Sequence, residues 1–160
     1  MPTARVVVTG LGAVTPVGND VPQFWTSLVS GKSGVGRITS FDPHQFDSQI
    51  AGEVRDYDPK LTIPIKESRR MEKFSQYAVT AAGEALKDSG IDMTKEDPFE
   101  VGVLIGSGVG SLRILEETHS IYLNRGPEKF SPFMIPHLLI NMASGWVSMR
   151  PIFPGFFLVA

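Results

Sequence analysis

The sequence predicts an α/β protein, because short β-branched segments alternate with longer segments of helical periodicity. Residues 5–9 (RVVVT) and 101–105 (VGVLI) are typical of buried strands, and each is followed by a glycine-rich turn. Between them, apolar residues at helical spacing predict one helix that begins between Pro64 and Ser68 and ends at Gly90. Strands separated by helices indicate a layered fold with some parallel pairing.

The other elements follow from local signals. Residues 21–30 predict a short helix, with Asp20 as its cap and Gly31 as its stop. Residues 31–60 are irregular, with a short strand expected around residues 50–54. Two further helices are expected over residues 111–123 and 136–149, and alanines along the helix that ends at Gly90 predict close packing against another helix or a sheet.

Composition excludes several classes of protein. Of the 160 residues, 42% are hydrophobic and 20% charged, which argues against intrinsic disorder. A net charge of -2 argues against a dedicated nucleic-acid binder. The opening apolar run is broken by glycines, so it predicts a strand rather than a signal peptide, and no stretch approaches the roughly 18 apolar residues of a membrane span. The sequence therefore predicts a soluble, cytoplasmic protein without a membrane segment.

The chain contains no cysteine, which removes disulfides, thiolate nucleophiles and Cys-based zinc sites. His44, His119 and His137 have no companion ligand at metal-binding spacing, so neither a metal nor a cofactor is expected.

Three glycine motifs are similar in part to nucleotide-binding loops. The segment after residue 9 supplies Gly10 and Gly12 but then has Thr15 and Pro16, which do not fit a dinucleotide fingerprint. Gly31-Lys32-Ser33 lacks the earlier glycine of a phosphate-binding loop. The run GSGVG, residues 106–110, is best explained as a tight strand-to-helix turn that lies against a neighbouring backbone.

One charge cluster stands out. Lys66, Arg69, Arg70 and Lys73 are spaced i, i+3, i+4 and i+7, which would put four cations on one helical face. An ordinary solvated face is one interpretation, and a docking surface for an acidic partner or a phosphate group is the other.

The last ten residues, PIFPGFFLVA, carry no charge and differ from the sequence before them. A buried final strand is one interpretation. An abnormal end, through truncation or a change of reading frame, is the favoured one.

In order along the chain, these segments resemble the β-ketoacyl-acyl-carrier-protein synthases, specifically the type II elongating enzymes. The matching stretches run colinearly from about residue 5 to residue 149 and include RVVVTGLGAVTPVGN, RRMEKFSQYAV, ALKDSGI, VGVLIGSGVG and GPEKFSPFMIPHLLINMASG. The resemblance implies an incomplete N-terminal half of a thiolase-like layered α/β fold over residues 1–150, with residues 151–160 as an atypical apolar tail.

The resemblance also implies a reaction, a partner and an assembly. The family are acyltransferases of fatty acid biosynthesis: an acyl group moves to an active-site cysteine, and malonyl-carrier protein then attacks the thioester in a decarboxylative condensation. The intact enzymes are homodimers that bind acyl carrier protein. The family's catalytic cysteine, histidines and lysine belong to sequence that this chain does not contain, so no catalytic residue is carried over.

Binding residues are carried over by position. Lys66, Arg69 and Arg70 match the basic residues that face the carrier protein, while Val109, Phe133 and Met134 match residues that line the acyl pocket. The first hypothesis is therefore an N-terminal part of a condensing enzyme that is inactive alone. The alternatives are a non-catalytic module that binds carrier protein or a second subunit, and a defective product that does not fold.

Overall fold

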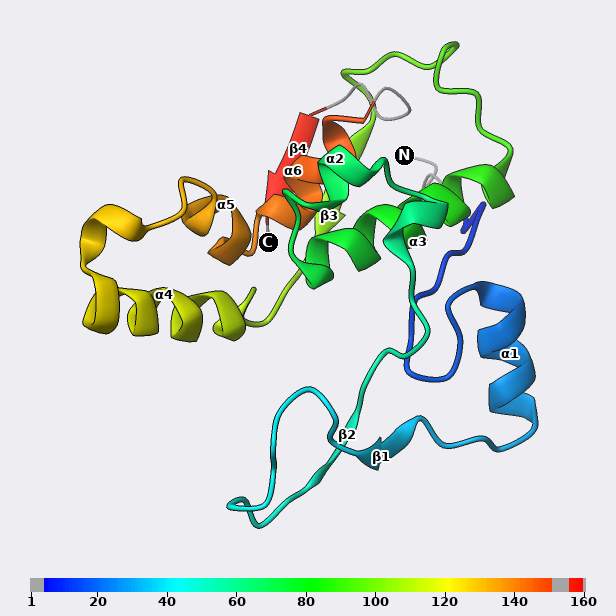
Figure 1. Cartoon of the computed structure of the whole chain (residues 1–160). Coiled ribbons are helices and arrows are strands. Elements are labelled where there is room, and N and C mark those ends of the chain that lie inside the picture. The colour runs from blue at the N-terminus through cyan, green and yellow to red at the C-terminus, as the bar shows by residue number, and fades with distance from the viewer. Residues whose placement is uncertain (1–4, 151–155, 160) are drawn as a thin grey trace. The chain divides into compact units, whose positions relative to one another are not determined.

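The structure is a computed structural model that describes residues 5–150 and 156–159 (Figure 1). These residues form two compact units. The N-terminal unit comprises the residues up to Asp58 together with Thr80–Gly90, and the C-terminal unit comprises Pro59–Val79 together with the residues from Ile91 onward. None of the helices in the described part of the chain is both long and apolar enough to cross a membrane.

The N-terminal unit begins with an extended segment that is not a strand. The prediction of a buried strand at residues 5–9 is wrong: these residues belong to no sheet, and Val6 and Val8 are 93% and 81% exposed. The physical reason is that a strand needs a hydrogen-bonded neighbour, and no described segment pairs with this one. The β-branched residues at positions 5–9 therefore lie in a segment that belongs to no described sheet.

Helix α1 (Val21–Val29) confirms the helix expected over residues 21–30. The carboxylate of Asp20 accepts a hydrogen bond from the backbone N–H of Gln23 at 2.7 Å, which satisfies one of the free donors of the first turn. Gly31 then adopts a positive φ of 67°, which ends the helix.

A two-stranded antiparallel ribbon follows α1. Strand β2 (Ile50–Gly52) confirms the strand expected near residue 50, and it pairs with β1 (Val35–Arg37), which was not predicted. Next to the ribbon, both carboxylate oxygens of Glu53 accept hydrogen bonds from Thr39, and one also accepts from the N–H of Ser40. Glu53 therefore closes the loop that joins the two strands.

Glu53 makes this ribbon sensitive to acid. Hydrogen bonds from Thr39 and then Ser40 lower the pKa of Glu53 from 4.5 to about 2. Since the folded-state pKa is depressed, the ionised carboxylate stabilises the fold above pH 4.5, and this contribution is lost as the pH falls toward 2. We expect carbon-detected NMR to show that the Glu53 carboxylate titrates well below pH 4.5. In Glu53→Gln, the free energy of unfolding should fall less steeply as the pH is lowered from 4.5 toward 2. Glu96→Gln, at an exposed site, is the control; equal effects in both variants would contradict the assignment.

The second half of helix α3 (Lys73–Ser89) packs against the loop that follows the extended segment. A Cβ on Gly10 would lie 2.1 Å from the carbonyl oxygen of Ala85, and one on Gly12 would lie 1.9 Å from that of Ala81. The alanines do permit close packing, as predicted, but the partner is a loop rather than a helix or sheet. The absence of a side chain at Gly10 and Gly12 is what allows the two backbones to approach this closely.

Glu84 fastens this loop to α3. Its carboxylate accepts hydrogen bonds from the backbone N–H groups of Ala13 at 2.9 Å and Val21 at 2.8 Å. One side chain thus holds both the glycine-containing loop and the first residue of α1.

In the C-terminal unit, the single helix expected up to Gly90 is interrupted. The short helix α2 (Ile65–Ser68) has Arg69 as its C-cap, and α3 starts only at Lys73. The turn between them lets the neighbours Met71 and Glu72, 3% and 8% exposed, both enter the interior. The side-chain amide of Gln76 donates to the carbonyls of Ser68 and Met71, which supplies partners for groups that the interruption leaves free.

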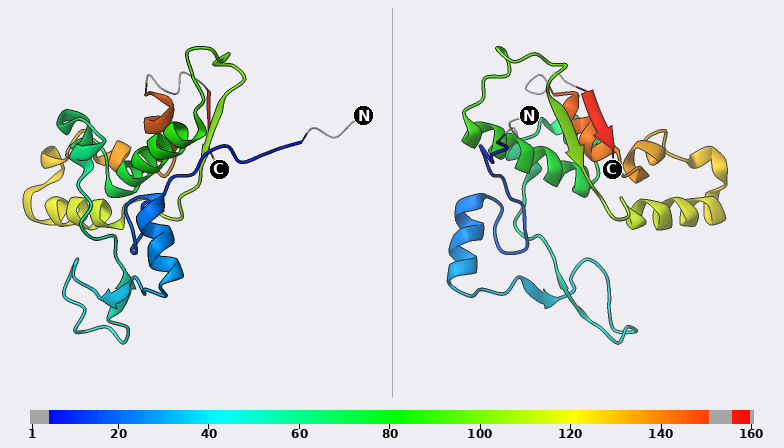
Figure 2. Two further views of the ribbon diagram at one scale, coloured as in Figure 1. Left: turned by 90° about the vertical axis from the view of Figure 1, so that its right-hand side faces the viewer. Right: turned by 180° about the vertical axis from the view of Figure 1, so that it is seen from behind.

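Strand β3 (Gly102–Ile105) confirms the strand expected at residues 101–105, and it pairs in parallel with β4 (Phe156–Val159). Part of the tail is thus a strand, while residues 151–155 and 160 lie outside the described residues. Helix α6 (Met142–Ser148) packs against this strand pair (Figure 2). Among the residues of this unit whose side chains the structure describes, the buried apolar ones are Ile63, Met71, Val79, Val103, Ala143 and Val147.

The remaining helices are α4 and α5. Helix α4 (Leu112–Arg125) confirms the helix expected from residue 111. The helix expected over residues 136–149 is instead divided into α5 (Met134–Leu138) and α6, because Leu139 is extended, with ψ at 127°. The described residues of this unit also form two single-turn 3-10 helices, Pro59–Leu61 and Pro127–Lys129.

Candidate functional site

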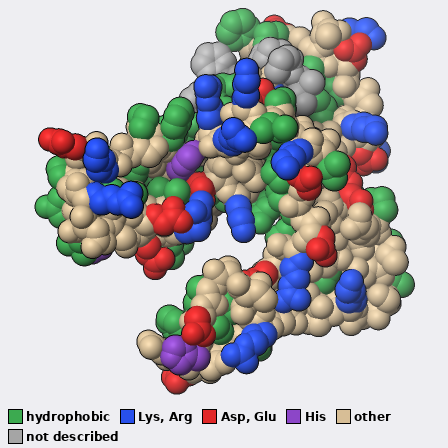
Figure 3. Space-filling view, in the orientation of Figure 1, with side chains coloured by type: hydrophobic (Ala, Val, Ile, Leu, Met, Phe, Trp, Pro, Cys, Tyr) green, Lys and Arg blue, Asp and Glu red, His purple; other side chains and the backbone are tan. Residues whose placement is uncertain are grey.

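The basic residues singled out from the sequence lie on and just after α2. Lys66 is in the helix, Arg69 is its C-terminal cap and Arg70 follows in the turn. All three side chains are exposed, and none forms an ion pair with a carboxylate of the described residues. Figure 3 shows Lys and Arg side chains gathered over the region of α2 and the start of α3. We call Lys66, Arg69 and Arg70 the basic face.

Residues of α2 outside the basic face fix this helix to the rest of the C-terminal unit. Ser68 is buried, and Glu67 forms an ion pair with Arg150 at 3.1 Å. Ser68 thus faces the interior, while the three cations of the basic face are exposed to solvent. The i, i+3, i+4, i+7 spacing does not describe one helix here, since Lys73 begins α3 beyond the turn.

A carboxylate beneath the turn ties this region to the glycine-rich loop. Glu72, 8% exposed, accepts a hydrogen bond from the Ser111 hydroxyl at 3.0 Å and one from the Arg113 guanidinium at 2.6 Å. The Ser111 oxygen in turn accepts from the backbone N–H of Ile114, at the first turn of α4. The Glu72 carboxylate therefore fixes the point where the loop enters α4.

Arg113 also pairs with Glu117 on the exposed face of α4, at 2.5 Å. Burial works to lower the pKa of the Arg113 guanidinium, but the charge of Glu72 and the contacts with Glu117 outweigh it and raise the pKa. Sequence reasoning missed Glu72 and Arg113, because nothing in the residue pattern shows that they meet. The helix-start position of Ser111 was the one detectable signal.

The residues matched to the acyl pocket lie on two segments that touch. Val109 is in the loop before α4, Phe133 caps the N-terminus of α5, and Met134 is the first residue of that helix. A Cβ on Gly110 would lie 2.2 Å from the carbonyl oxygen of Leu138, at the end of α5. The loop and α5 are thus in close backbone contact, while Val109 and Phe133 remain 59% and 41% exposed.

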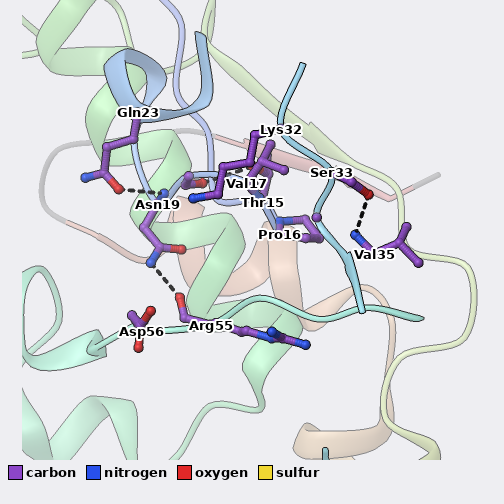
Figure 4. A pocket seen from close by; sticks show the side chains of 12 residues that line it. Thr15, Pro16, Val17, Asn19, Gln23, Lys32, Ser33, Val35, Arg55 and Asp56 are labelled. Carbon is purple, nitrogen blue, oxygen red and sulfur yellow. Dashed lines mark hydrogen bonds between the residues drawn. The ribbon is translucent and has the colours of Figure 1, made fainter. Parts of the chain in front are cut away.

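A polar pocket of about 330 Å³ lies within the N-terminal unit (Figure 4). It is lined by residues 15–19, Gln23, residues 32–35, Arg55 and Asp56. The amide of Asn19 donates to the carbonyl of Arg55 at 2.8 Å, which joins two of its walls. The cationic ends of Lys32 and Arg55 point to different sides of the pocket in Figure 4, so its charges do not converge on one point.

Metal-binding geometry is not found in the part of the chain that the structure describes: it contains no group of three or more His, Cys, Asp and Glu side chains that could hold an ion. The Nδ1 atom of His44 lies 2.8 Å from Oδ2 of Asp42, and both side chains are exposed. With no cysteine in the sequence, the chain also offers no thiolate.

Solved structures place this architecture among the ketosynthases. The ishigamide ketosynthase/chain length factor has a TM-score of 0.83 and 25% identity, over 96% of this chain and 39% of the other. The structure "AntDE:AntF (apo): type II PKS acyl-carrier protein in complex with its ketosynthase bound to the hexaketide" has a TM-score of 0.69 and 24% identity, over 89% and 37% of the two chains. The likeness to the second structure shows the fold alone.

Sequence comparison then gives the family. Residues 3–156 match "Beta-ketoacyl synthase, N-terminal domain", and the chain belongs to that family. The "3-oxoacyl-[acyl-carrier-protein] synthase 2" of Coxiella burnetii is 47% identical over 150 residues, which cover 94% of this chain and 36% of the relative. The chain thus spans little more than a third of the length of these proteins. The resemblance to β-ketoacyl synthases and the thiolase-like fold are confirmed.

Proposed function

We propose that this chain is the N-terminal part of a 3-oxoacyl-[acyl-carrier-protein] synthase, a transferase that condenses an acyl thioester with malonyl-carrier protein. The observation that carries the proposal is the 47% identity to a protein of that name, over nearly all of this chain but 36% of the relative. The family assignment over residues 3–156 supports it.

We further propose that the 160 residues alone do not catalyse condensation. In the family the acyl group is carried on a cysteine, because a thiolate attacks the incoming thioester and leaves again as a good leaving group. This chain has no cysteine, and its described residues hold no ion site that could activate another nucleophile. Without an acyl-enzyme, no acyl thioester is held on the protein in a position where the malonyl carbanion can attack it.

The test is direct incubation of the purified chain with acyl- and malonyl-carrier protein, with mass spectrometry of the carrier-bound products. We expect no 3-oxoacyl product above the enzyme-free blank. The full-length Coxiella burnetii relative serves as the positive control. Product that increases in proportion to the concentration of the 160-residue chain would refute the proposal.

A second candidate function is that of a module that binds carrier protein without catalysis. The observation that favours it is the basic face: its three cations are exposed and are not paired with carboxylates of the described residues. Such cations attract an acidic partner and orient it as it approaches. The same module could pair with an intact subunit, which would appear as a defined heterodimer in sedimentation.

Reversal of two charges on the basic face should weaken carrier binding. We expect Arg69→Glu with Arg70→Glu to raise the Kd for acyl carrier protein by about tenfold or more, since attraction becomes repulsion. Affinity of the unmodified chain should fall as salt is added. The charge-matched control is Lys32→Glu with Lys87→Glu, two exposed cations of the N-terminal unit. Equal weakening by both pairs would mean that only net charge matters.

A further inference from the structure

Arg70 lies against the aromatic ring of Phe133. The guanidinium carbon is 5.8 Å from the ring centroid, within the range of a cation–π contact. Arg70 belongs to the basic face, and Phe133 is the residue that caps α5. The turn after α2 and the start of α5 therefore meet through these two side chains.

The ring is itself supported. Phe133 stacks on His137 one turn further along α5, with ring centroids 6.1 Å apart and planes inclined by 23°. The backbone N–H of Phe133 donates to the Ser131 hydroxyl at 3.2 Å, and its carbonyl accepts from the N–H of His137 at 3.0 Å. Phe133 is thus held by the backbone and by a second ring, although 41% of its surface is exposed.

A guanidinium that rests on a ring keeps its N–H groups available. The donors of arginine lie in the plane of the group, so they can bind a carboxylate while the flat face contacts an aromatic ring. An arginine side chain without contacts loses conformational entropy when it binds a partner. An arginine already held against a ring loses less, so its binding is more favourable. Lys66 and Arg69 have no described aromatic partner, so the effect is specific to Arg70.

We propose that Phe133 is a positioning residue for Arg70: its ring holds the guanidinium ready for a carboxylate of an acidic partner, so that one side chain serves both the basic face and the segment matched to the acyl pocket. This inference rests on the proposed docking function. By reciprocity, a ligand that displaces the Phe133 ring would weaken docking at the basic face, and docking would weaken the binding of that ligand by the same factor.

A double-mutant cycle on the full chain tests the proposal, with acyl carrier protein and a glutamate-rich peptide as two separate probes. We expect Phe133→Leu to weaken binding about threefold in the unmodified chain, from lost preorganisation. The same change should have no effect when Arg70 is already Gln. Phe130→Leu is the matched control, because the Phe130 ring packs on Tyr122, 6.3 Å away, in place of an arginine.

A structural readout separates positioning from damage to the fold. The Arg70 side-chain protons should show ring-current shifts in NMR that disappear in Phe133→Leu, while the backbone spectrum of α5 is kept. Equal weakening by Phe133→Leu in both Arg70 backgrounds, or unshifted Arg70 protons, would overturn the inference. If the peptide binds in a Phe133-dependent way and the carrier protein does not, the docking proposal fails and the inference stands. If neither binds, both fail.

Discussion

Replacement of Gly110 by alanine should lower the free energy of unfolding by about 2–5 kcal/mol, from two separate causes. Gly110 has φ at +76°, a conformation that costs an L-residue about 1–2 kcal/mol. The added Cβ would also lie 2.2 Å from the Leu138 carbonyl oxygen, so the loop and α5 must move apart, which costs about 1–3 kcal/mol more. Urea unfolding of the variant beside the unmodified chain measures the sum.

Two other glycines divide this effect into its parts. Gly31 has φ at +67° but nothing within 4 Å of an added Cβ, so Gly31→Ala should show the backbone cost alone. Gly108, in the same loop as Gly110, also has open space around it and no positive φ, and Gly108→Ala should be close to neutral. If Gly110→Ala is no worse than Gly31→Ala, the close approach to α5 contributes nothing.

Removal of the Glu72 carboxylate should have the second-largest effect on stability. Glu72→Ala takes the acceptor from Ser111 and the ion pair from Arg113 at a site that is 8% exposed. Hydrogen bonds to charged groups contribute about 1.5–3 kcal/mol each, but Arg113 is 54% exposed and its share is screened by solvent. We therefore expect a loss of about 2–3 kcal/mol in urea unfolding.

The control removes the other partner of the same guanidinium. Glu117 is 53% exposed, so Glu117→Ala should cost less than about 1 kcal/mol. Hydrogen exchange gives a local check, because the N–H of Ile114 donates to Ser111 and should lose protection in Glu72→Ala alone. Similar losses of unfolding free energy in Glu72→Ala and Glu117→Ala would show that the buried Glu72 carboxylate contributes no more to stability than the exposed Glu117 carboxylate.

Local signals in the sequence were sufficient for the helices with clear ends. Asp20 and Gly31 delimit α1, and Ser111 starts α4, because capping depends on residues next to one another. The interruption before α3 has no such signal, since the segment SRRMEK contains neither glycine nor proline. Burial of both Met71 and Glu72 decides it, and burial depends on residues far along the chain.

The candidate site was predictable in its composition but not in its connections. The exposed cations Lys66, Arg69 and Arg70 could be found from their spacing, even though the helix assumed for that spacing does not exist. The contact of Arg70 with Phe133 joins two elements that no periodicity relates. The failed strand at residues 5–9 has the same origin, because composition can favour extended backbone but cannot supply the strand beside it.

The parallel pairing of β3 with β4 has a consequence for the rate of folding. Its register joins Gly102 to Phe156 and Ile105 to Val159, across a long stretch of chain whose described residues include α4, α5, α6 and a 3-10 helix. Closing so long a loop costs conformational entropy before the hydrogen bonds between the strands can form. This pairing should therefore form late in folding, after local helices such as α4. Until then, β3 is an apolar strand with an unpaired edge. The time spent in that state determines how readily folding molecules of this chain aggregate.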